Sequence, residues 1–335
     1  MAGGKWAQKI QLGRETVPGT AVAATTIWRG VGGNLKDDSE VTMVDEQIGI
    51  AIPTNRSYIA QVGGSLSMAA TPATYEQLLH ILEAGIKTVG TGAADGPGSG
   101  KVYAYTTPTT TVNTIKTYTI ETGDNQQAEE MAYCFVTKFT LSGERGQAVM
   151  MSADWIGRGV SGTAFTGSLT VPVVKEILSA LGSLYIDNTT IGTTQVTETL
   201  LAWELSVETG WKAKWTIDGL ATVFAFHYFD RDAFSAEFSA TYEHNATAVA
   251  EKTKFRQNAV RLIRLQIAGD ALTTPGTTYS YKTLRIDMAA KYTSFEALDA
   301  DDGNSIIDCK AQVGYDPTAA LGLSITVVNE LASVP

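Results

Sequence analysis

The sequence is poor in cysteine, in histidine and in long apolar runs. Its 335 residues include two cysteines and three histidines. Two cysteines in a chain of this length do not form a disulfide framework, so we expect Cys134 and Cys309 to be buried free thiols. No apolar run approaches the length of a membrane span, and the first residues lack the apolar region of a signal peptide. These absences predict a soluble protein that is made and used in a cytoplasm.

Basic residues are also scarce. The chain has 25 Lys and Arg against 35 Asp and Glu, which gives a net charge of −10. Affinity for duplex DNA is built from phosphate neutralisation, so this balance argues against tight wrapping of DNA. It leaves open that DNA passes nearby without sticking. With 44% hydrophobic residues the chain can bury a core, and its length predicts about two domains.

Alternation of apolar and polar residues is the dominant pattern. Within 235–243, Ala236, Phe238, Ala240 and Tyr242 share one face, and polar residues take the other. The same alternation occurs over 149–155, 211–217 and 284–288. Such segments are half-buried strands of an antiparallel sheet. The sequence therefore predicts a mainly β protein of the antiparallel β-sandwich or barrel type.

Two helices interrupt the strands. Thr71 and Pro72 predict an N-cap and a first helical residue, with a helix over 73–84 that ends at Gly85. A second helix is predicted over 246–257 with Asn245 as its cap, and its charged residues indicate an exposed outer face.

An internal repeat relates the two halves of the chain. Residues 65–71 precede the first predicted helix, and the similar residues 235–241 precede the second, 170 positions later. Gly19-Thr20 with Trp28 matches Gly192-Thr193 with Trp203, and 149–157 matches 306–314. The common order predicts tandem duplicated domains at 1–165 and 166–335, each flanked by one α-helix.

Two segments are predicted to be loops of different kinds. The glycine-rich residues 90–100 should be mobile because they cannot pack a core. Residues 36–55 mix acidic and large aliphatic side chains, which suits an arm that docks on a partner. The aliphatic residues of this arm are Val41, Met43, Val44, Ile48, Ile50 and Ile52.

No motif predicts a catalytic, cofactor or metal site. Asp95 stands where the dinucleotide and phosphate-loop patterns require glycine. Residues 299–304 resemble a calcium loop but fit a tight turn at Asp302-Gly303 better. His244 near Glu243 could act in acid–base chemistry, yet a lone surface histidine is far commoner. The six tryptophans, at 6, 28, 155, 203, 211 and 215, are expected to pack in the core.

Three segments resemble the major tail tube proteins of long-tailed, non-contractile (siphovirus-type) bacteriophages in a two-domain form. They are 11–24, with Gly13, Glu15, Gly19 and Thr20 in the family's N-terminal spacing, then 139–157 and 313–331. The resemblance implies a structural, non-enzymatic virion protein whose β-sandwich domains join into a continuous barrel around a lumen. Phage DNA would transit that lumen without specific binding. The protein would belong to the virion tail, assembled in the bacterial host cytoplasm.

The same resemblance implies the assembly partners. Relatives with one domain form six-membered rings, so three copies of this chain would give a ring with pseudo-sixfold symmetry. Rings would stack through the arm, and other tail proteins such as the tape measure, terminator and baseplate would be partners. The second half carries an aromatic counterpart of the arm in 216–232, expected to pack within its own ring through Phe224, Phe226, Tyr228 and Phe229.

Other classes of function remain open from the sequence. A sandwich-type binding module, such as an adhesin or carbohydrate-binding domain, would use exposed tryptophans and stay a small oligomer. A capsid decoration or tail-terminator protein would share the domain without stacking. An enzyme would need a site that no residue pattern here provides.

Overall fold

The computed structural model describes residues 3–52, 55–215 and 234–335. This part of the chain is mainly β, with large antiparallel sheets and two α-helices, as the sequence predicts. The strands are β1 Lys9–Arg14, β2 Thr26–Ile27, β3 Lys36–Asp37, β4 Glu40–Met43, β5 Ser57–Gln61, β6 Gly64–Pro72, β7 Ala93–Ala94, β8 Lys101–Thr106, β9 Tyr118–Gly123, β10 Ala128–Glu144, β11 Met150–Gly157, β12 Val160–Thr163, β13 Gly182–Asp187, β14 Gln195–Val196, β15 Leu200–Thr209, β16 Phe234–Glu243, β17 Arg261–Ala271, β18 Tyr281–Phe295, β19 Asp299–Asp301, β20 Asn304–Val313 and β21 Leu323–Asn329; the helices are α1 Leu78–Gly85 and α2 Ala246–Arg256.

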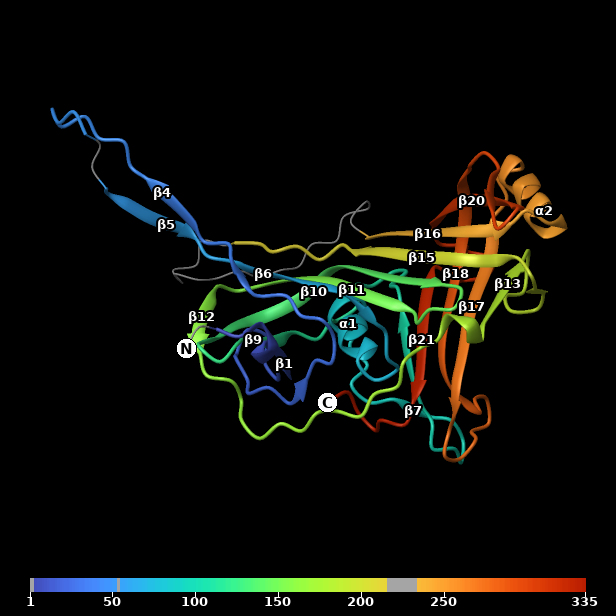
Figure 1. Ribbon diagram of the computed structural model, residues 1–335, viewed down its shortest axis with the longest axis horizontal. Helices are drawn as coiled ribbons and strands as arrows, with labels where there is room; N and C mark the ends of the chain where they lie inside the picture. The colour runs from blue at the N-terminus through green and yellow to red at the C-terminus, as the bar shows by residue number, and fades with distance from the viewer. Residues whose placement is uncertain (1–2, 53–54, 216–233) are drawn as a thin grey trace.

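One broad antiparallel sheet runs through both halves of the chain. Its strand order is β3-β6-β11-β10-β15-β16-β20-β18. Figure 1 shows β6, β11, β10, β15 and β16 running side by side, with β18 and β20 at the end beside α2. We call this the large sheet.

Two long strands each belong to the large sheet and to a second sheet. The first part of β10 pairs with β9 and β12, and its last part pairs with β11 and β15. The first part of β18 pairs with β17 and β21, and its last part pairs with β20. The second sheets are β2-β1-β9-β10-β12 and β14-β13-β17-β18-β21-β8-β7. Each half therefore folds two sheet layers over apolar side chains.

The same strand order occurs twice within the large sheet. β3, β6, β11 and β10 of the first half correspond in position to β15, β16, β20 and β18 of the second, and α1 follows β6 as α2 follows β16. The first half also contributes β7 and β8 to the second sheet of the second half, because β8 pairs with β21. The division at residue 165 stays a prediction.

Two details of the sequence alignment are wrong. The match of 149–157 with 306–314 uses an offset of 157, which aligns buried Met151 with exposed Asp308. The next residue, Cys309, is buried and faces the core as Met151 does. A shift of one residue in a strand moves every side chain to the other face, so the structural offset is 158. Trp28 follows β2 and Trp203 lies within β15, so these two tryptophans are not equivalent.

The predicted start of the first helix is also wrong. Thr71 and Pro72 end β6, where they pair with Met151 and Met150 of β11. The ladder holds this segment extended, and α1 begins only at Leu78. The second helix agrees with its prediction, because the Asn245 side chain accepts hydrogen bonds from two backbone N–H groups. Its Glu251, however, is buried against Arg261 and is not on the outer face.

The core joins both halves in one cluster of buried side chains. The alternating faces predicted over 149–155, 235–243 and 284–288 are buried as expected. In the alternating segment 211–217, the described residues 211–215 form no regular strand, since β15 ends at Thr209, and residues 216 and 217 lie outside the described residues. Cys134 and Cys309 are buried free thiols, as predicted, and burial raises the pKa of Cys309 to about 12.

The glycine-rich segment 90–100 is packed, contrary to its prediction. Asp95 is buried there and accepts hydrogen bonds from the backbone N–H groups of Thr278 and Tyr279 at 3.0 and 2.7 Å. Gly98 lies so close to the backbone of Gly276 that a Cβ atom would clash. Contacts with a distant loop thus order a segment that has no core of its own.

Candidate assembly surfaces

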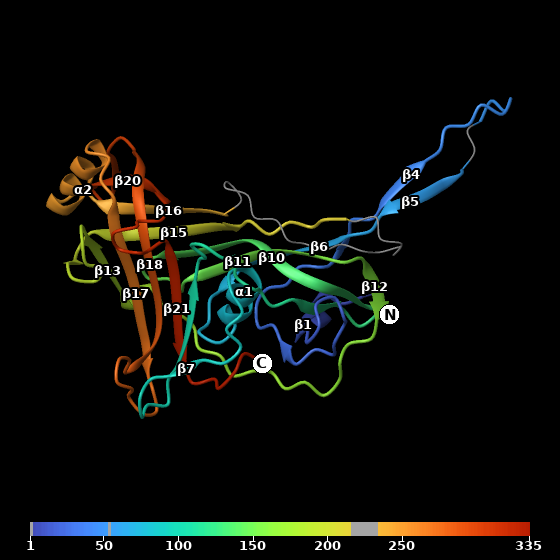
Figure 2. The same ribbon diagram turned by 180° about the vertical axis from the view of Figure 1, so that it is seen from behind.

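A two-stranded arm projects from the body of the molecule. It consists of β4, β5 and the connection between them. Figures 1 and 2 show β4 and β5 extending away from the large sheet and the second sheets. Near the point where the strands separate, the Val44 N–H donates to the Arg56 carbonyl at 3.0 Å, and Arg56 pairs with Glu46 at 2.6 Å. The arm is therefore a paired hairpin at its base and reaches well beyond the core.

Large apolar side chains line the arm in solvent. The tip residues Ile48, Ile50 and Ile52 are 55%, 63% and 77% exposed. Val41 and Met43 are also exposed, and Val44 is half-buried. The sequence prediction missed Tyr58 and Ile59, exposed on the returning strand, because it ended the arm at residue 55. Their alternating β-branched and aromatic composition was the available signal.

The aromatic counterpart of the arm lies outside the described residues. Phe224, Phe226, Tyr228 and Phe229 fall between β15 and β16, at the same place in the chain order as the arm between β3 and β6. Their role stays a prediction.

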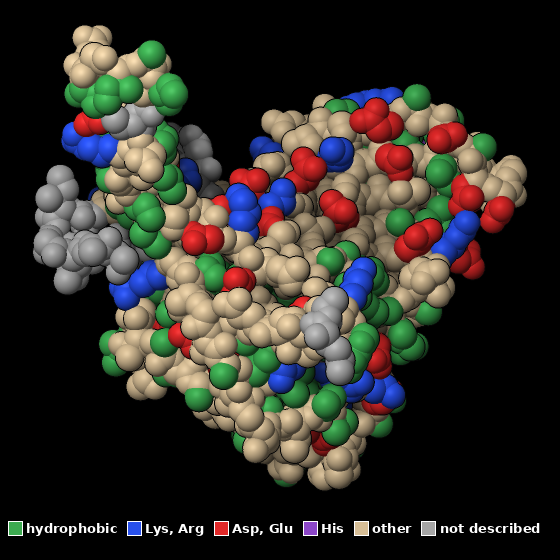
Figure 3. Space-filling view, turned by 60° about the vertical axis from the view of Figure 1, so that its left-hand side comes forward, with side chains coloured by type: hydrophobic (Ala, Val, Ile, Leu, Met, Phe, Trp, Pro, Cys, Tyr) green, Lys and Arg blue, Asp and Glu red, His purple; other side chains and the backbone are tan. Residues whose placement is uncertain are grey.

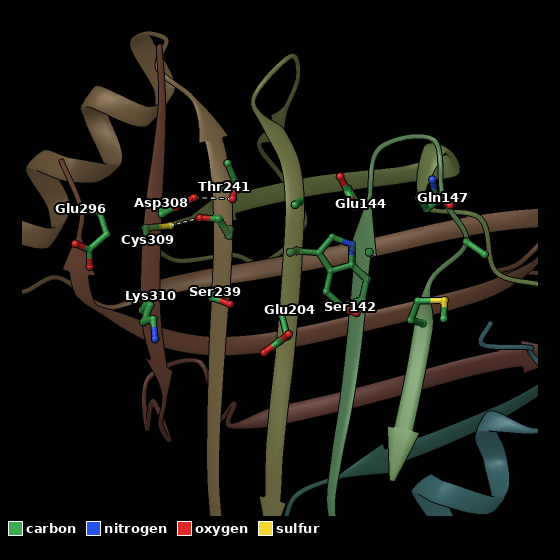
Figure 4. Close-up of a pocket in the computed structure, with 16 residues that line it drawn as sticks. Ser142, Glu144, Gln147, Glu204, Ser239, Thr241, Glu296, Asp308, Cys309 and Lys310 are labelled. Atoms are coloured by element: carbon green, nitrogen blue, oxygen red, sulfur yellow. Dashed lines mark hydrogen bonds between the residues drawn. The ribbon is translucent and has the colours of Figure 1, made fainter. Parts of the chain in front are cut away.

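One face of the large sheet is wet and polar. In the close-up of Figure 4, Ser142, Glu204, Ser239, Thr241 and Lys310 stand on neighbouring strands β10, β15, β16 and β20. They line a groove of about 720 Å³. The opposite side chains of these strands fill the core, so the pleat alone assigns the polar residues to this surface.

Carboxylates outnumber ammonium groups on this wet face. Lys138 lies 3.9 Å from Glu208, and Lys310 lies 3.5 Å from Glu237. Asp308 accepts a hydrogen bond from the Thr241 hydroxyl at 2.6 Å. Figure 3 shows acidic and basic side chains gathered in the hollow beside the arm. The acidic residues of this face include Glu144, Asp154, Glu204, Glu208, Glu237, Glu243 and Asp308, and the basic ones include Lys36, Lys138, Lys291 and Lys310.

The large sheet ends in two different strands. At one end, the pairings of β3 within the described chain are with β6. At the other, β17 leaves β18 at Ala290, and beyond that residue the described pairings of β18 are with β20. Exposed backbone edges of this kind are ready templates for pairing with another strand.

A buried carboxylate links the helix of the first half to neighbouring strands. Glu83 of α1 receives two hydrogen bonds from Arg14 at 2.9 and 2.7 Å and one from the Tyr118 hydroxyl at 3.1 Å. His80 lies against Tyr118, and burial together with the Arg14 charge lowers the pKa of His80 to about 3. The imidazole is thus neutral, and the cluster ties α1 to β1 and β9.

Two further carboxylates hold tight turns after the first strand of each half. Glu15 accepts a hydrogen bond from the Gly19 N–H at 2.7 Å, and Asp187 accepts one from the Gly192 N–H at 2.8 Å. Both glycines have φ near +80°, which explains the repeated Gly-Thr pair. Although desolvation opposes it, bonds from Thr193, Thr194 and Gly192 lower the pKa of Asp187.

The remaining candidate motifs lie at turns between elements of the second half. Asp302 and Gly303 form the two-residue turn of the β19–β20 hairpin, both with positive φ, as predicted. His244 is half-buried and donates its backbone N–H to the Ser305 carbonyl.

The tryptophans divide between core and surface. Trp28, Trp155 and Trp203 are buried as expected. Trp6 and Trp215 are exposed, which corrects the expectation that all six pack in the core.

No family model matches the chain, and no curated protein matches it either. Within residues 3–52, 55–215 and 234–335, no helix is long and apolar enough to cross a membrane.

Proposed function

We propose that this protein is the major tail tube subunit of a long-tailed, non-contractile bacteriophage. Its copies would form rings that stack into a tube, through which DNA passes during delivery to the host. The observation that carries the proposal is the large sheet, which spans the whole chain with one face in the core and one wet, hydroxyl-rich and acidic face. Such a face suits a channel wall that repels phosphates and does not grip them.

The repeat supports the ring size. Each chain contributes two sets of four strands in the same order, so three chains would contribute six sets around the lumen. An assembly in which one end of a sheet meets the other end of the next copy is heterologous, and it closes when the rotation allows. Closure would also remove the exposed sheet edges.

The arm supports stacking. Its tip residues leave apolar surface in water, which a lone globular subunit does not need. Docking on the adjacent ring would bury that surface, and other tail proteins such as the tape measure, terminator and baseplate would be partners of the resulting tube.

Electron microscopy of the purified protein tests the proposal. We expect tubes of indefinite length with a central channel. Rings should have a mass of about 107 kDa, three times the 35.7 kDa chain. Six chains per ring would refute the threefold arrangement while leaving the tube. Discrete particles at all concentrations would favour a binding module or a decoration protein, and glycan binding by them would select the former.

A further inference from the structure

The junction between the two halves is a complete example of how one strand set joins the next. β10 ends the first set and β15 begins the second, and they pair from Lys138–Glu208 to Glu144–Ala202. Phe139 faces Val207, and Leu141 faces Leu205, all four buried in the core. The sheet therefore crosses from one set to the next without a break in its ladder or its core.

The end of β18 has the same form as the end of β10 but lacks its neighbour. In the first half, β9 leaves β10 at Cys134, and β15 takes the same edge from Lys138 onward. In the second half, β17 leaves β18 at Ala290, and the described pairings of residues 291–295 are with β20. The position that β15 fills on β10 is thus open on β18.

The strand that matches β15 is β3, at the far end of the sheet. Lys36 pairs with Ser65, and Glu208 pairs with Ser235, the residue equivalent to Ser65 at an offset of 170. Lys36 is therefore the equivalent of Glu208. Upstream of β3, Gly33 lies against the Ser67 carbonyl, so the chain continues along β6 beyond the paired residues. Leu35 is buried and takes the place of Val207.

We propose that the open edge of β18 receives β3 of a second copy of this chain, in the register that β15 has on β10. Lys310 is equivalent to Ser152 by the offset of 158. Lys310 pairs with Ser294 and Ser152 pairs with Thr140, so Ser294 is the equivalent of Thr140. Asn34 stands for Ser206 by the same step along β3. The β-bulge at Thr293 leaves that residue of β18 without a counterpart. The register therefore puts Leu35 of one copy beside buried Tyr292 of the next and Asn34 opposite Ser294.

A groove next to this edge gives the incoming chain a path. It measures about 370 Å³, and its lining includes Ala289, Tyr292, Gly314 and Tyr315. In the first half the matching place is filled, because Trp211 and Ala213, just after β15, pack with Ile156 against the cluster that contains Phe135. The smaller Ala289 and Gly314 stand where Phe135 and Ile156 stand, which leaves room for a segment of the neighbour.

The segment that enters this groove is the one that follows β3. Counting from the equivalence of Asp37 and Thr209, Ser39 and Val41 take the places of Trp211 and Ala213. Val41 is exposed in the single chain and would be covered there. Edge pairing would therefore fix the base of the arm and set the direction in which its tip points.

One pair in this register differs in charge from the internal junction. Lys138 faces Glu208 inside the chain, whereas Lys291 would face Lys36 of the neighbour. Lys36 is already paired with Asp38 at 2.6 Å, which lessens the repulsion. The apolar pairs and the backbone ladder carry the contact, and surface ion pairs contribute little to such junctions.

Disulfide trapping tests the register with a control built into the chain. Arg145 and Leu201 are a hydrogen-bonded pair, because the Arg145 N–H donates to the Leu201 carbonyl at 3.1 Å. The two kinds of pair alternate along the ladder, so Thr140 and Ser206, five residues further along, form a non-hydrogen-bonded pair. Cα atoms of such pairs lie about 4.5 Å apart, within disulfide range. T140C/S206C should therefore close within one chain on oxidation, without a change in oligomer mass.

The test variants are N34C and S294C. Mixed and oxidised, they should give a covalent dimer whose linked peptides contain residues 34 and 294, while each variant alone gives none. The double variant N34C/S294C should give a ladder that ends at three chains. Circular dichroism checks that every variant is folded, and the native cysteines are buried.

The outcomes separate this inference from the proposed function on which it rests. If T140C/S206C closes but the mixed sample gives no 34–294 link, the register is wrong, even when microscopy of the same sample shows tubes. Dimers of S294C with itself would indicate an isologous contact and overturn the head-to-tail arrangement. A 34–294 ladder without tubes would uphold the edge pairing and refute the tail tube.

Discussion

The exposed isoleucines of the arm allow a sharp separation of folding from assembly. Replacing Ile48, Ile50 and Ile52 with serine removes apolar side chains that are 55–77% exposed in the single chain. Full burial of one such side chain contributes about 1.5–3 kcal/mol. Scaled by these exposures and reduced for the cost of ordering the arm, the three together should contribute roughly 3 kcal/mol to stacking.

That energy has a direct readout in the concentration at which tubes form. A change of about 3 kcal/mol corresponds to roughly a 100-fold change in an equilibrium constant. We therefore expect the triple variant to need about 100-fold more protein to form tubes in light scattering and microscopy. Its unfolding free energy should stay within about 0.5 kcal/mol of the parent, because the residues touch no core.

A matched control lies in the segment that connects the two halves. Val171 and Val173 are 63% and 91% exposed and can be changed to serine together. Their replacement removes apolar surface of similar size away from the arm, so tubes should form as in the parent. Normal tube growth by the isoleucine variant would refute the arm as the stacking element. Equal loss in both variants would attribute the effect to general apolar surface.

Three further predictions concern the stability of the single chain. Glu83→Gln leaves the Arg14 charge without its buried partner and should lower the unfolding free energy by about 3 kcal/mol in denaturant titrations, whereas Glu204→Gln on the wet face should change it by less than about 0.5 kcal/mol. Asn245→Ala removes the cap of α2 and should cost about 1 kcal/mol, and an unchanged midpoint would show that the two capping bonds contribute nothing. Asp187 has a lowered pKa in the folded chain, so its stabilisation is present above the ordinary carboxyl pKa and is lost as the pH falls through the lowered value. Asp187→Asn should therefore melt lower than the parent at pH 7, with a gap that narrows as the pH falls below the ordinary carboxyl pKa, and a gap independent of pH would contradict this account.

Local patterns in the sequence predicted strands where β11, β16 and β18 lie, and one of the helix starts. Alternation with period two assigned Ala236, Phe238 and Tyr242 to the core because side-chain direction in a strand depends only on position parity. Asn245 capped its helix as predicted because a cap acts within one turn of the chain. The Asp302-Gly303 turn followed from the same short-range chemistry.

The tertiary structure decided whatever depends on distant partners. The extended state of Thr71 and Pro72 comes from pairing with β11, about eighty residues away, which outweighs the local helix signal. Asp95 orders a glycine-rich loop only because residues 277–279 come to meet it.

The candidate assembly surfaces divide in the same way. The sequence alone predicted an apolar arm, because large aliphatic and acidic residues are mixed within the single segment 36–55. That β10 pairs with β15, and that β3 and β18 lie at the two ends of the large sheet, could not be read from the chain. Strand pairing depends on backbone groups that every residue carries, so only the tertiary structure determines which edges meet and which remain open.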